Sequence, residues 1–196
     1  MSVAPLKGYI ALLDVLGFSE LIARESRGRE LERYFDAIDQ ATNKVHDVQY
    51  VLFSDTIVIT TPSRSHEDLL QIVRASSYAM HYLLKEGLPT RGAISYGTYY
   101  RSRSDKGVVI AGPAFIEAYH FEKSQDWVGI TLAPSVLREV PDLGTKCGFP
   151  LTQPSEQNTV FEDSFSWVMT LQPCHSIPWH SDGGQSRRTL DGFAVV

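Results

Sequence analysis

Residues 8–19 read GYIALLDVLGFS, a short apolar run interrupted by Asp14 and followed by a turn at Gly17. A continuous apolar run of this length, bounded by a turn signal, is typical of a buried strand, and we predict one over residues 8–15. A carboxylate at the end of such a strand is costly to bury unless it has a partner. Taken alone, Asp14 is equally compatible with a cap for the following helix and with a metal ligand.

A helical region and a hairpin follow this strand. Apolar residues recur at helical spacing over residues 31–45, and the helical region is expected to break near residues 26–28. Residues 49–61 read QYVLFSDTIVITT and are rich in β-branched and aromatic side chains. This stretch predicts two strands joined by a tight turn at Ser54 and Asp55.

A second helix and a further strand complete the core of the predicted fold. Ser65 and Asp68 form a capping pattern at the start of a helix, and Gly87 is the residue expected to end it. Residues 90–100 then read as a strand. The order β-α-β-β-α-β predicts an α+β fold of the ferredoxin-like type.

Additional strands and a helix are expected after this core, and the pattern weakens beyond residue 134. We assign residues 1–172 to one domain and residues 173–196 to an irregular C-terminal tail. The additional elements are predicted as strands over residues 108–111, 127–132 and 165–171, and as a helix over residues 114–123 after Pro113.

Composition limits the classes of function. Hydrophobic residues make up 43% of the sequence, which suits a folded domain, and the net charge of −5 argues against a nucleic-acid partner. No apolar run approaches the length of a membrane span, and the N-terminal residues lack the layout of a signal peptide. Because Cys147 and Cys174 are expected to be reduced thiols, these features together predict a cytoplasmic protein without a membrane partner.

Asp14 and Asp55 are the candidate catalytic residues. An Asp at a hairpin tip is by itself a common turn residue. In a β-α-β-β unit, however, the first strand and the hairpin are neighbours in one sheet, so the two carboxylates are expected to meet. Like charges this close repel each other, and a pair of carboxylates suits Mg²⁺ or Mn²⁺. Two such ions can activate an attacking oxygen and neutralise a leaving group.

The turn after Asp14 is the candidate phosphate-binding segment. It joins a strand to the start of a helix, where backbone N–H groups and the helix dipole favour an anion. A lone glycine is weak evidence by itself, and its position directly after Asp14 gives it weight. The predicted substrate-binding residues of this segment are Val15, Leu16, Gly17, Phe18 and Ser19.

Four blocks of the sequence resemble the class III adenylyl and guanylyl cyclases. Residues 14–19, DVLGFS, are similar to the D-x-x-G-F-[ST] signature of that family, and Ser54-Asp55 stands at the position of its hairpin G-D. Residues 91–97, RGAISYG, are similar to its R-x-G-I-x-x-G strand. Residues 112–120, GPAFIEAYH, stand where the family has G-x-x-V-N-x-A-x-R.

Two positions depart from the pattern of that family. Its transition-state Asn falls on Ile116 and its Arg on His120, and its purine-selecting Lys and Asp are not recognisable. The sequence is more similar to the pyrimidine cyclases of the bacterial Pycsar anti-phage systems, which make cyclic UMP or cyclic CMP on infection. In those systems the cyclic nucleotide activates a separate effector.

This resemblance implies a metal-dependent enzyme that works as a homodimer with two composite active sites. It implies two Mg²⁺ or Mn²⁺ ions per site, with Asp14, Val15 and Asp55 as the metal-binding residues. It also implies a nucleoside triphosphate as the substrate, with UTP favoured over CTP, and cyclic UMP and pyrophosphate as the products.

Tyr50 and Arg91 are the remaining predicted substrate-binding residues. Tyr50 is either an ordinary strand aromatic or, as the resemblance implies, a contact for the pyrimidine base. Arg91 either pairs with a carboxylate across the sheet or reaches the nucleotide.

Two alternative functions stay open: a cytidylate cyclase, and a catalytically silent nucleotide-binding module, which the changes at Ile116 and His120 favour. A diguanylate-type cyclase would require a G-G-[DE]-[DE]-F hairpin, which this sequence lacks.

Overall fold

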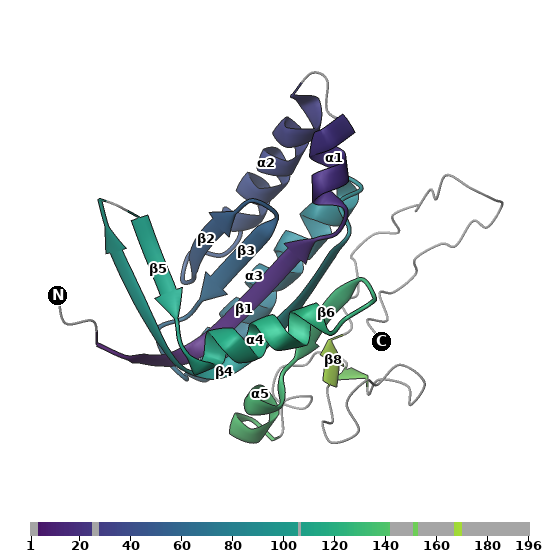
Figure 1. Cartoon of the computed structure of the whole chain (residues 1–196). Helices are drawn as coiled ribbons and strands as arrows, with labels where there is room; N and C mark the ends of the chain where they lie inside the picture. Colours follow the sequence, from purple (N-terminus) through teal and green to yellow (C-terminus); the bar gives the residue numbers. More distant parts are fainter. Residues whose placement is uncertain (1–3, 25–27, 106, 142–150, 153–166, 170–196) are drawn as a thin grey trace.

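Strand β1 (Leu6–Val15) runs through the middle of a mixed sheet, between β3 (Thr56–Thr60) and β4 (Thr90–Ser104) (Figure 1). Both neighbours are antiparallel to β1. The computed structural model describes residues 4–24, 28–105, 107–141, 151–152 and 167–169. Most of β1 is buried on both of its faces, which explains its nearly continuous apolar sequence.

The sheet extends outward from β1 on both sides. On one side β3 pairs with β2 (Gln49–Phe53), and the two form the predicted hairpin. On the other side β4 pairs in parallel with β6 (Gly129–Leu132), and short pieces, β8 (Trp167–Met169) and β7 (Leu151–Thr152), continue the sheet. The far part of β4 leaves this sheet and pairs with β5 (Gly107–Ala111) as a projecting hairpin.

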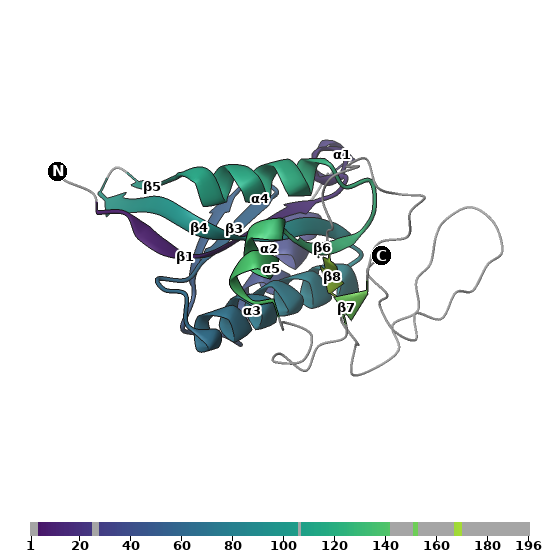
Figure 2. The same ribbon diagram turned by 90° about the horizontal axis from the view of Figure 1, so that it is seen from below.

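Helices cover the two faces of the sheet unequally (Figure 2). Helix α4 (Pro113–Lys123) lies across β1 and β4 on one face. The other face is covered by α2 (Arg29–Thr42), α3 (His66–Lys85) and α5 (Pro134–Glu139), and the short α1 (Phe18–Arg24) follows β1 directly. None of the described helices is both long and apolar enough to cross a lipid bilayer.

Side chains of β1 alternate between two apolar cores. Tyr9, Leu13 and their odd-numbered neighbours belong to the larger core, which is closed by α2 and α3. Ile10 and Leu12 belong to a smaller core under α4. Because side chains on a strand alternate between faces, Asp14 lies on the side of the sheet that α4 covers.

The predicted β-α-β-β-α-β order is confirmed, with the core strands arranged as β2-β3-β1-β4. The break expected near residues 26–28 separates α1 from α2, and Gly28 before α2 is left-handed with φ 73°. Ser65 accepts a hydrogen bond of 3.0 Å from the Asp68 amide at the start of α3, as the capping pattern predicted. Gly87, with φ 78°, follows the end of that helix.

Three features extend beyond the sequence prediction, and one of them is the short strand β7. Strand β4 continues to Ser104 rather than ending at residue 100, because its last five residues pair with β5. Helix α5 forms where no element was predicted, and Pro134 occupies its first turn. The proposed tail at residues 173–196, with its boundary at residue 172, lies outside the described residues, and so do Cys147 and Cys174.

Candidate active site

The backbone brings Asp14 and Asp55 to the same edge of the sheet. Asp14 pairs in register with Thr56, the residue that follows Asp55 in the β2–β3 hairpin. The amide of Val15 donates a hydrogen bond of 3.0 Å to the carbonyl of Asp55. The end of β1 and the tip of the hairpin are therefore held side by side, as the β-α-β-β order predicted.

The hairpin tip is also held from the helical side. Ser54 adopts a left-handed conformation, with φ 56°, which is unusual for a residue with a side chain. The hydroxyl of Tyr34, from α2, donates a hydrogen bond of 2.9 Å to the Ser54 carbonyl. Burial, and secondarily the charge of Asp55, raises the pKa of Tyr34 to about 12. Tyr34 therefore remains a hydrogen-bond donor at neutral pH and fixes the turn that carries Asp55.

Asp14 and three other charged side chains form a cluster. Asp14 Oδ2 lies 3.4 Å from Arg91 Nη2, and Asp14 Oδ1 lies 3.5 Å from Lys123 Nζ. Arg91 Nε donates to Glu122 Oε1 at 2.7 Å, and Arg91 Nη1 donates to the carbonyl of Gln125 at 2.8 Å. Lys123 Nζ is also 3.4 Å from Glu122 Oε2. Two carboxylates and two cations thus balance one another.

Glu122 is the fully buried member of this cluster. Burial raises the pKa of its carboxyl, and the negative charge of Asp14 acts in the same direction. The positive charges of Lys123 and Arg91, with the hydrogen bond from Arg91, oppose that rise. A buried carboxylate is tolerated only with such partners, so Glu122 ties the last turn of α4 to β4 next to Asp14.

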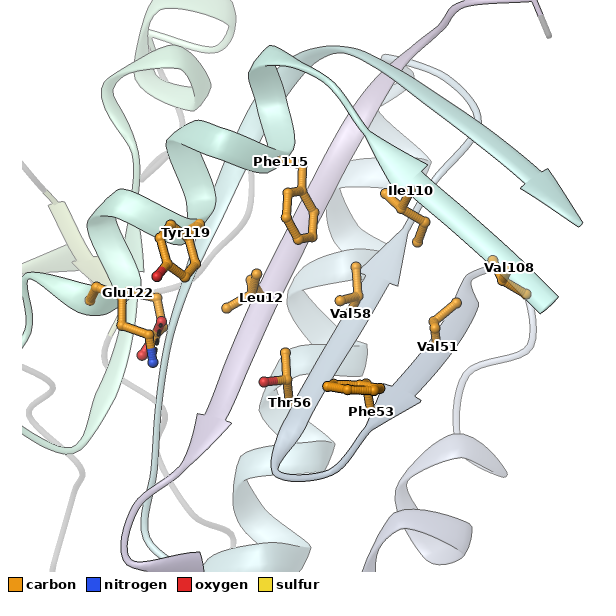
Figure 3. A pocket seen from close by; sticks show the side chains of 11 residues that line it. Leu12, Val51, Phe53, Thr56, Val58, Val108, Ile110, Phe115, Tyr119 and Glu122 are labelled. Carbon is orange, nitrogen blue, oxygen red and sulfur yellow. Dashed lines mark ion pairs between the residues drawn. The ribbon is translucent and has the colours of Figure 1, made fainter. Parts of the chain in front are cut away.

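An open hollow of about 330 Å³ adjoins the cluster (Figure 3). Aromatic rings from β2 and α4 and aliphatic side chains from β1, β3 and β5 line most of it, while Glu122 lies at one end. Lys123 also lines the hollow and is ion-paired with Glu122. A site with an apolar body and charges at one end suits a ligand with a ring and an anionic tail. The lining residues are Leu12, Val51, Phe53, Thr56, Val58, Val108, Ile110, Phe115, Tyr119, Glu122 and Lys123.

The predicted phosphate-binding segment forms the turn between β1 and α1. The amides of Val15 and Leu16 already donate within the protein, to the carbonyls of Asp55 and Pro89. Gly17 is left-handed, with φ 74°, and exposed. A phosphate contact at this turn would therefore fall to the amides of Gly17 and of the two residues that follow it, Phe18 and Ser19, at the start of α1.

Tyr50 and Arg91 occupy different surroundings. Tyr50 packs against the larger core on the face that α2 and α3 cover, whereas its neighbour Val51 lines the hollow. Burial raises the pKa of Tyr50 to about 12, and its hydroxyl makes no hydrogen bond within the described residues. Arg91 pairs with two carboxylates, Asp14 and Glu122, which is one of the two roles considered for it.

Tyr34, Glu122 and Lys123 are site residues that the sequence analysis missed. Glu122 carried a signal: it follows Ala114 and Ala118 at intervals of four, and all three residues are buried on one face of α4. A Glu that continues an apolar stripe is a candidate for a buried ion pair. Tyr34 and Lys123 carried no comparable signal, because their partners are distant in sequence.

The oxygen ligands of Asp14 and Asp55 fit a hard divalent cation. No group of three or more His, Cys, Asp or Glu side chains able to hold a metal ion occurs within the described residues. A metal ion held here would need further oxygen ligands, from a backbone carbonyl, water or a phosphate, which is usual for Mg²⁺. The Asp14 carboxylate faces two cations in this structure, so a metal ion would have to replace at least one of them.

Neither a family model nor a curated protein sequence matches this chain. Solved structures do match its fold. The adenylyl cyclase CyaB from P. aeruginosa has a TM-score of 0.65 at 14% identity, covering 86% of this chain and 95% of that chain. The catalytic core of a rhodopsin-guanylyl cyclase with converted specificity, in complex with ATPαS, has a TM-score of 0.61 at 13% identity, with coverages of 85% and 98%.

A third match is the guanylyl cyclase domain of the RhoGC fusion protein from Blastocladiella emersonii. Its monomeric form has a TM-score of 0.64 at 12% identity, and an unconventional dimeric form has 0.62 at 15% identity. Both alignments cover 86% of this chain and 98% of that chain. At these identities the likeness defines the fold, which is that of nucleotidyl cyclase catalytic domains.

We predict that Tyr34→Phe loosens the hairpin tip without disrupting the core. The ring and its packing are retained, and the loss of one hydrogen bond to the Ser54 carbonyl should lower the free energy of unfolding by about 1 kcal/mol. Amide exchange at Val15 should become faster, because its acceptor is the Asp55 carbonyl in that turn. Urea denaturation and hydrogen exchange measure both effects, with the exposed Tyr100→Phe as the control. Unchanged stability together with unchanged exchange would contradict this role.

Proposed function

We propose that this chain is a metal-dependent pyrimidine nucleotide cyclase that converts UTP to cyclic UMP and pyrophosphate. The observation that carries the proposal is the convergence of Asp14 and Asp55 at one edge of a cyclase-type sheet, beside an apolar hollow. Following the resemblance in sequence, the product would serve in the cytoplasm as a second messenger for a separate effector in anti-phage defence.

In this proposal the ribose 3′-oxygen forms a bond to the α-phosphorus, and the bond from that phosphorus to the bridging oxygen breaks. Pyrophosphate leaves, and the hydroxyl proton passes to solvent. Mg²⁺ or Mn²⁺, held by Asp14, Asp55 and the Val15 backbone, would favour ionisation of the 3′-hydroxyl and neutralise the leaving group. The chain itself would position the nucleotide, which supplies much of the rate in phosphoryl transfer.

The residues proposed to bind substrate are divided between the turn and the strands. Amides from Gly17 to Ser19 would receive phosphate oxygens. Following the resemblance in sequence, the hydroxyl of Tyr50 would bond to the base, which would then approach from the sheet face that α2 and α3 cover and not from the hollow. A buried hydroxyl without a partner, as at Tyr50, is uncommon in folded proteins, which supports a ligand contact. Uracil and cytosine differ at one donor and acceptor edge, so the same site could instead serve CTP.

A catalytically silent nucleotide-binding module is the second candidate function. The observation that favours it is the exposed aliphatic side chain of Ile116, which cannot donate a hydrogen bond, at the position of the transition-state Asn of class III cyclases. The pair formed by Asp14 and Asp55 favours the enzyme, because a module that only binds nucleotide has no need of two metal-binding carboxylates. Product formation from NTPs separates the two candidates.

A homodimer with composite sites is the proposed assembly. The open face of the sheet and the projecting hairpin of β4 and β5 carry apolar side chains that are exposed among the described residues. Among them, Phe53 is 77% exposed on β2 and Val109 is 65% exposed on β5. A second copy in two-fold contact would bury these side chains and close the hollow, and dimerisation also has precedent in one of the matched cyclase domains.

We predict that Asp14→Asn and Asp55→Asn each lower product formation from UTP by about 100-fold or more, since each removes a charge needed at the reacting phosphates. The assay incubates each protein with UTP and Mn²⁺ or Mg²⁺ and quantifies cyclic nucleotide by chromatography. Asp36→Asn, at an exposed position of α2, is the matched control and should retain full activity. Near-wild-type turnover in either folded active-site variant would refute the metal-site assignment.

A separate prediction concerns the base. Wild type should have its highest kcat/KM with UTP and remain poor with ATP and GTP. Tyr50→Phe should lower kcat/KM for UTP by about tenfold, the usual effect of one lost hydrogen bond, while leaving the melting temperature unchanged because the hydroxyl has no described partner. Tyr82→Phe, half-buried on α3, is the control. A purine preference would overturn the pyrimidine proposal, and an unaffected Tyr50→Phe would leave Tyr50 a packing residue.

The dimer generates its own prediction. Val109→Asp should convert a dimer at micromolar concentration into a monomer and reduce activity with it, because a charge would be buried in the contact. Phe35→Asp, at a 61% exposed phenylalanine on α2 that lies outside the proposed contact, should leave the mass unchanged. Light scattering coupled to size exclusion gives the masses. A wild type that is monomeric, with activity per molecule independent of dilution, would exclude composite sites.

A further inference from the structure

Lys123 is the last residue of α4 and lines the hollow. It is ion-paired with Glu122, which Figure 3 shows at one end of the hollow. The Lys123 ammonium lies 3.5 Å from Asp14 Oδ1, 3.4 Å from Glu122 Oε2 and 5.9 Å from the centre of the Tyr119 ring. It therefore occupies the space beside the carboxylate that is proposed to bind metal. Neither the sequence motifs nor the proposed function gives this residue a role.

The two cations next to Asp14 differ in how firmly they are held. Arg91 is 20% exposed and makes hydrogen bonds of 2.7 and 2.8 Å to Glu122 and to the Gln125 carbonyl. Lys123 is 44% exposed, and its ion pairs are longer than the 2.7–2.9 Å typical of tight charge-assisted bonds. Arg91 is thus fixed in the structure of β4 and α4, whereas Lys123 can leave Asp14 with little rearrangement.

The positive charges beside Asp14 would require Lys123 to move away when a metal ion binds. Asp14 and Glu122 are balanced by Arg91 and Lys123, so a divalent cation added at Asp14 would meet two positive charges at short range. Of these, only Lys123 has an exposed ammonium on a flexible four-carbon stem. The hollow beside it is otherwise lined mainly by apolar side chains, so a displaced ammonium would find its counter-charge on a bound anion.

We propose that Lys123 is an exchangeable counter-ion, which neutralises Asp14 in the unloaded protein and moves to the phosphate oxygens of a triphosphate when a divalent cation takes its place. This inference rests on the proposed metal site, and it adds a phosphate-binding residue to the proposed function. Asp14 is then compensated by Lys123 in the unloaded protein and by the divalent cation in the loaded protein. In the loaded state Lys123 supplies positive charge at the triphosphate, without an arginine on α4.

The first test uses Mn²⁺ alone, without nucleotide. Lys123→Met keeps the apolar stem and removes the charge, so the protein should bind Mn²⁺ about tenfold more tightly than wild type, while Lys123→Arg should resemble wild type. Free Mn²⁺ measured by electron paramagnetic resonance gives the dissociation constants. Lys44→Met, at an exposed site outside the cluster, is the matched control. Unchanged or weaker Mn²⁺ binding by folded Lys123→Met would overturn the exchange.

The second test uses 3′-deoxy-UTP, which cannot cyclise, at saturating Mn²⁺. Lys123→Met should bind it at least tenfold more weakly than wild type, Lys123→Arg should recover most of the affinity, and the difference should shrink as salt is raised. Equal affinity in wild type and Lys123→Met would overturn the phosphate contact. A purely structural lysine would alter the melting temperature without producing opposite changes in metal and nucleotide affinity.

These measurements separate the inference from the function on which it rests. Wild type that binds Mn²⁺ and 3′-deoxy-UTP with the expected variant effects, yet makes no product, would overturn the cyclase activity and support the role of Lys123. Wild type that makes product, with Lys123→Met unchanged in both affinities, would overturn the role of Lys123 alone. Wild type that binds neither Mn²⁺ nor nucleotide would overturn both.

Discussion

The register of β1 is the constraint on which the site depends. Its alternate residues face two different cores, so a slip of one residue would move the Asp14 carboxylate into the apolar core that α2 and α3 cover. Gly92 helps to fix that register, because a Cβ there would lie 2.4 Å from Leu13 Cδ2 and 2.7 Å from the Leu12 carbonyl oxygen. With the register set, Asp14 stands opposite Arg91 on one side and the hairpin on the other.

Compensation of buried charge then determines how α4 sits on this sheet. Glu122 has no contact with solvent, so its carboxylate depends on Arg91 and Lys123 for stability. The side-chain Nε2 of Gln125 donates a hydrogen bond of 2.8 Å to the Gly92 carbonyl, from just beyond the end of the same helix. Breaking the bond of Arg91 to Glu122, or that of Gln125 to the Gly92 carbonyl, would leave a buried polar group unpaired, which is more costly than the loss of an exposed pair. The charged end of the hollow is therefore rigid except at Lys123.

The sequence predicted those features that depend on local pattern. The buried strand, the hairpin tip at Ser54 and the capped start of α3 each have a signal within a few residues, and each forms as expected. The features that the sequence did not predict depend on which helices and strands pack against each other. That Tyr50 would face the helices, while Val51 faces the hollow, follows only from the register of β2 on β3. The contact of Lys123 with Asp14 follows only from the path of α4 across β1.

The path of α4 across β1 also matters for Ile116 and His120, the two positions of α4 that depart from the cyclase pattern. The exposed aliphatic side chain at Ile116 cannot donate a hydrogen bond, and His120 is an exposed residue whose ring lies 5.9 Å from that of Tyr119. An imidazole ring lacks the planar five-donor fork of an arginine guanidinium. Lys123 lies three residues further along the same helix, close to one turn, and its ammonium reaches Asp14. The positive charge of Lys123, one turn further along α4 than His120, would be close enough to bind the phosphates. In the absence of metal, the same charge would stabilise the Asp14 carboxylate at the end of β1.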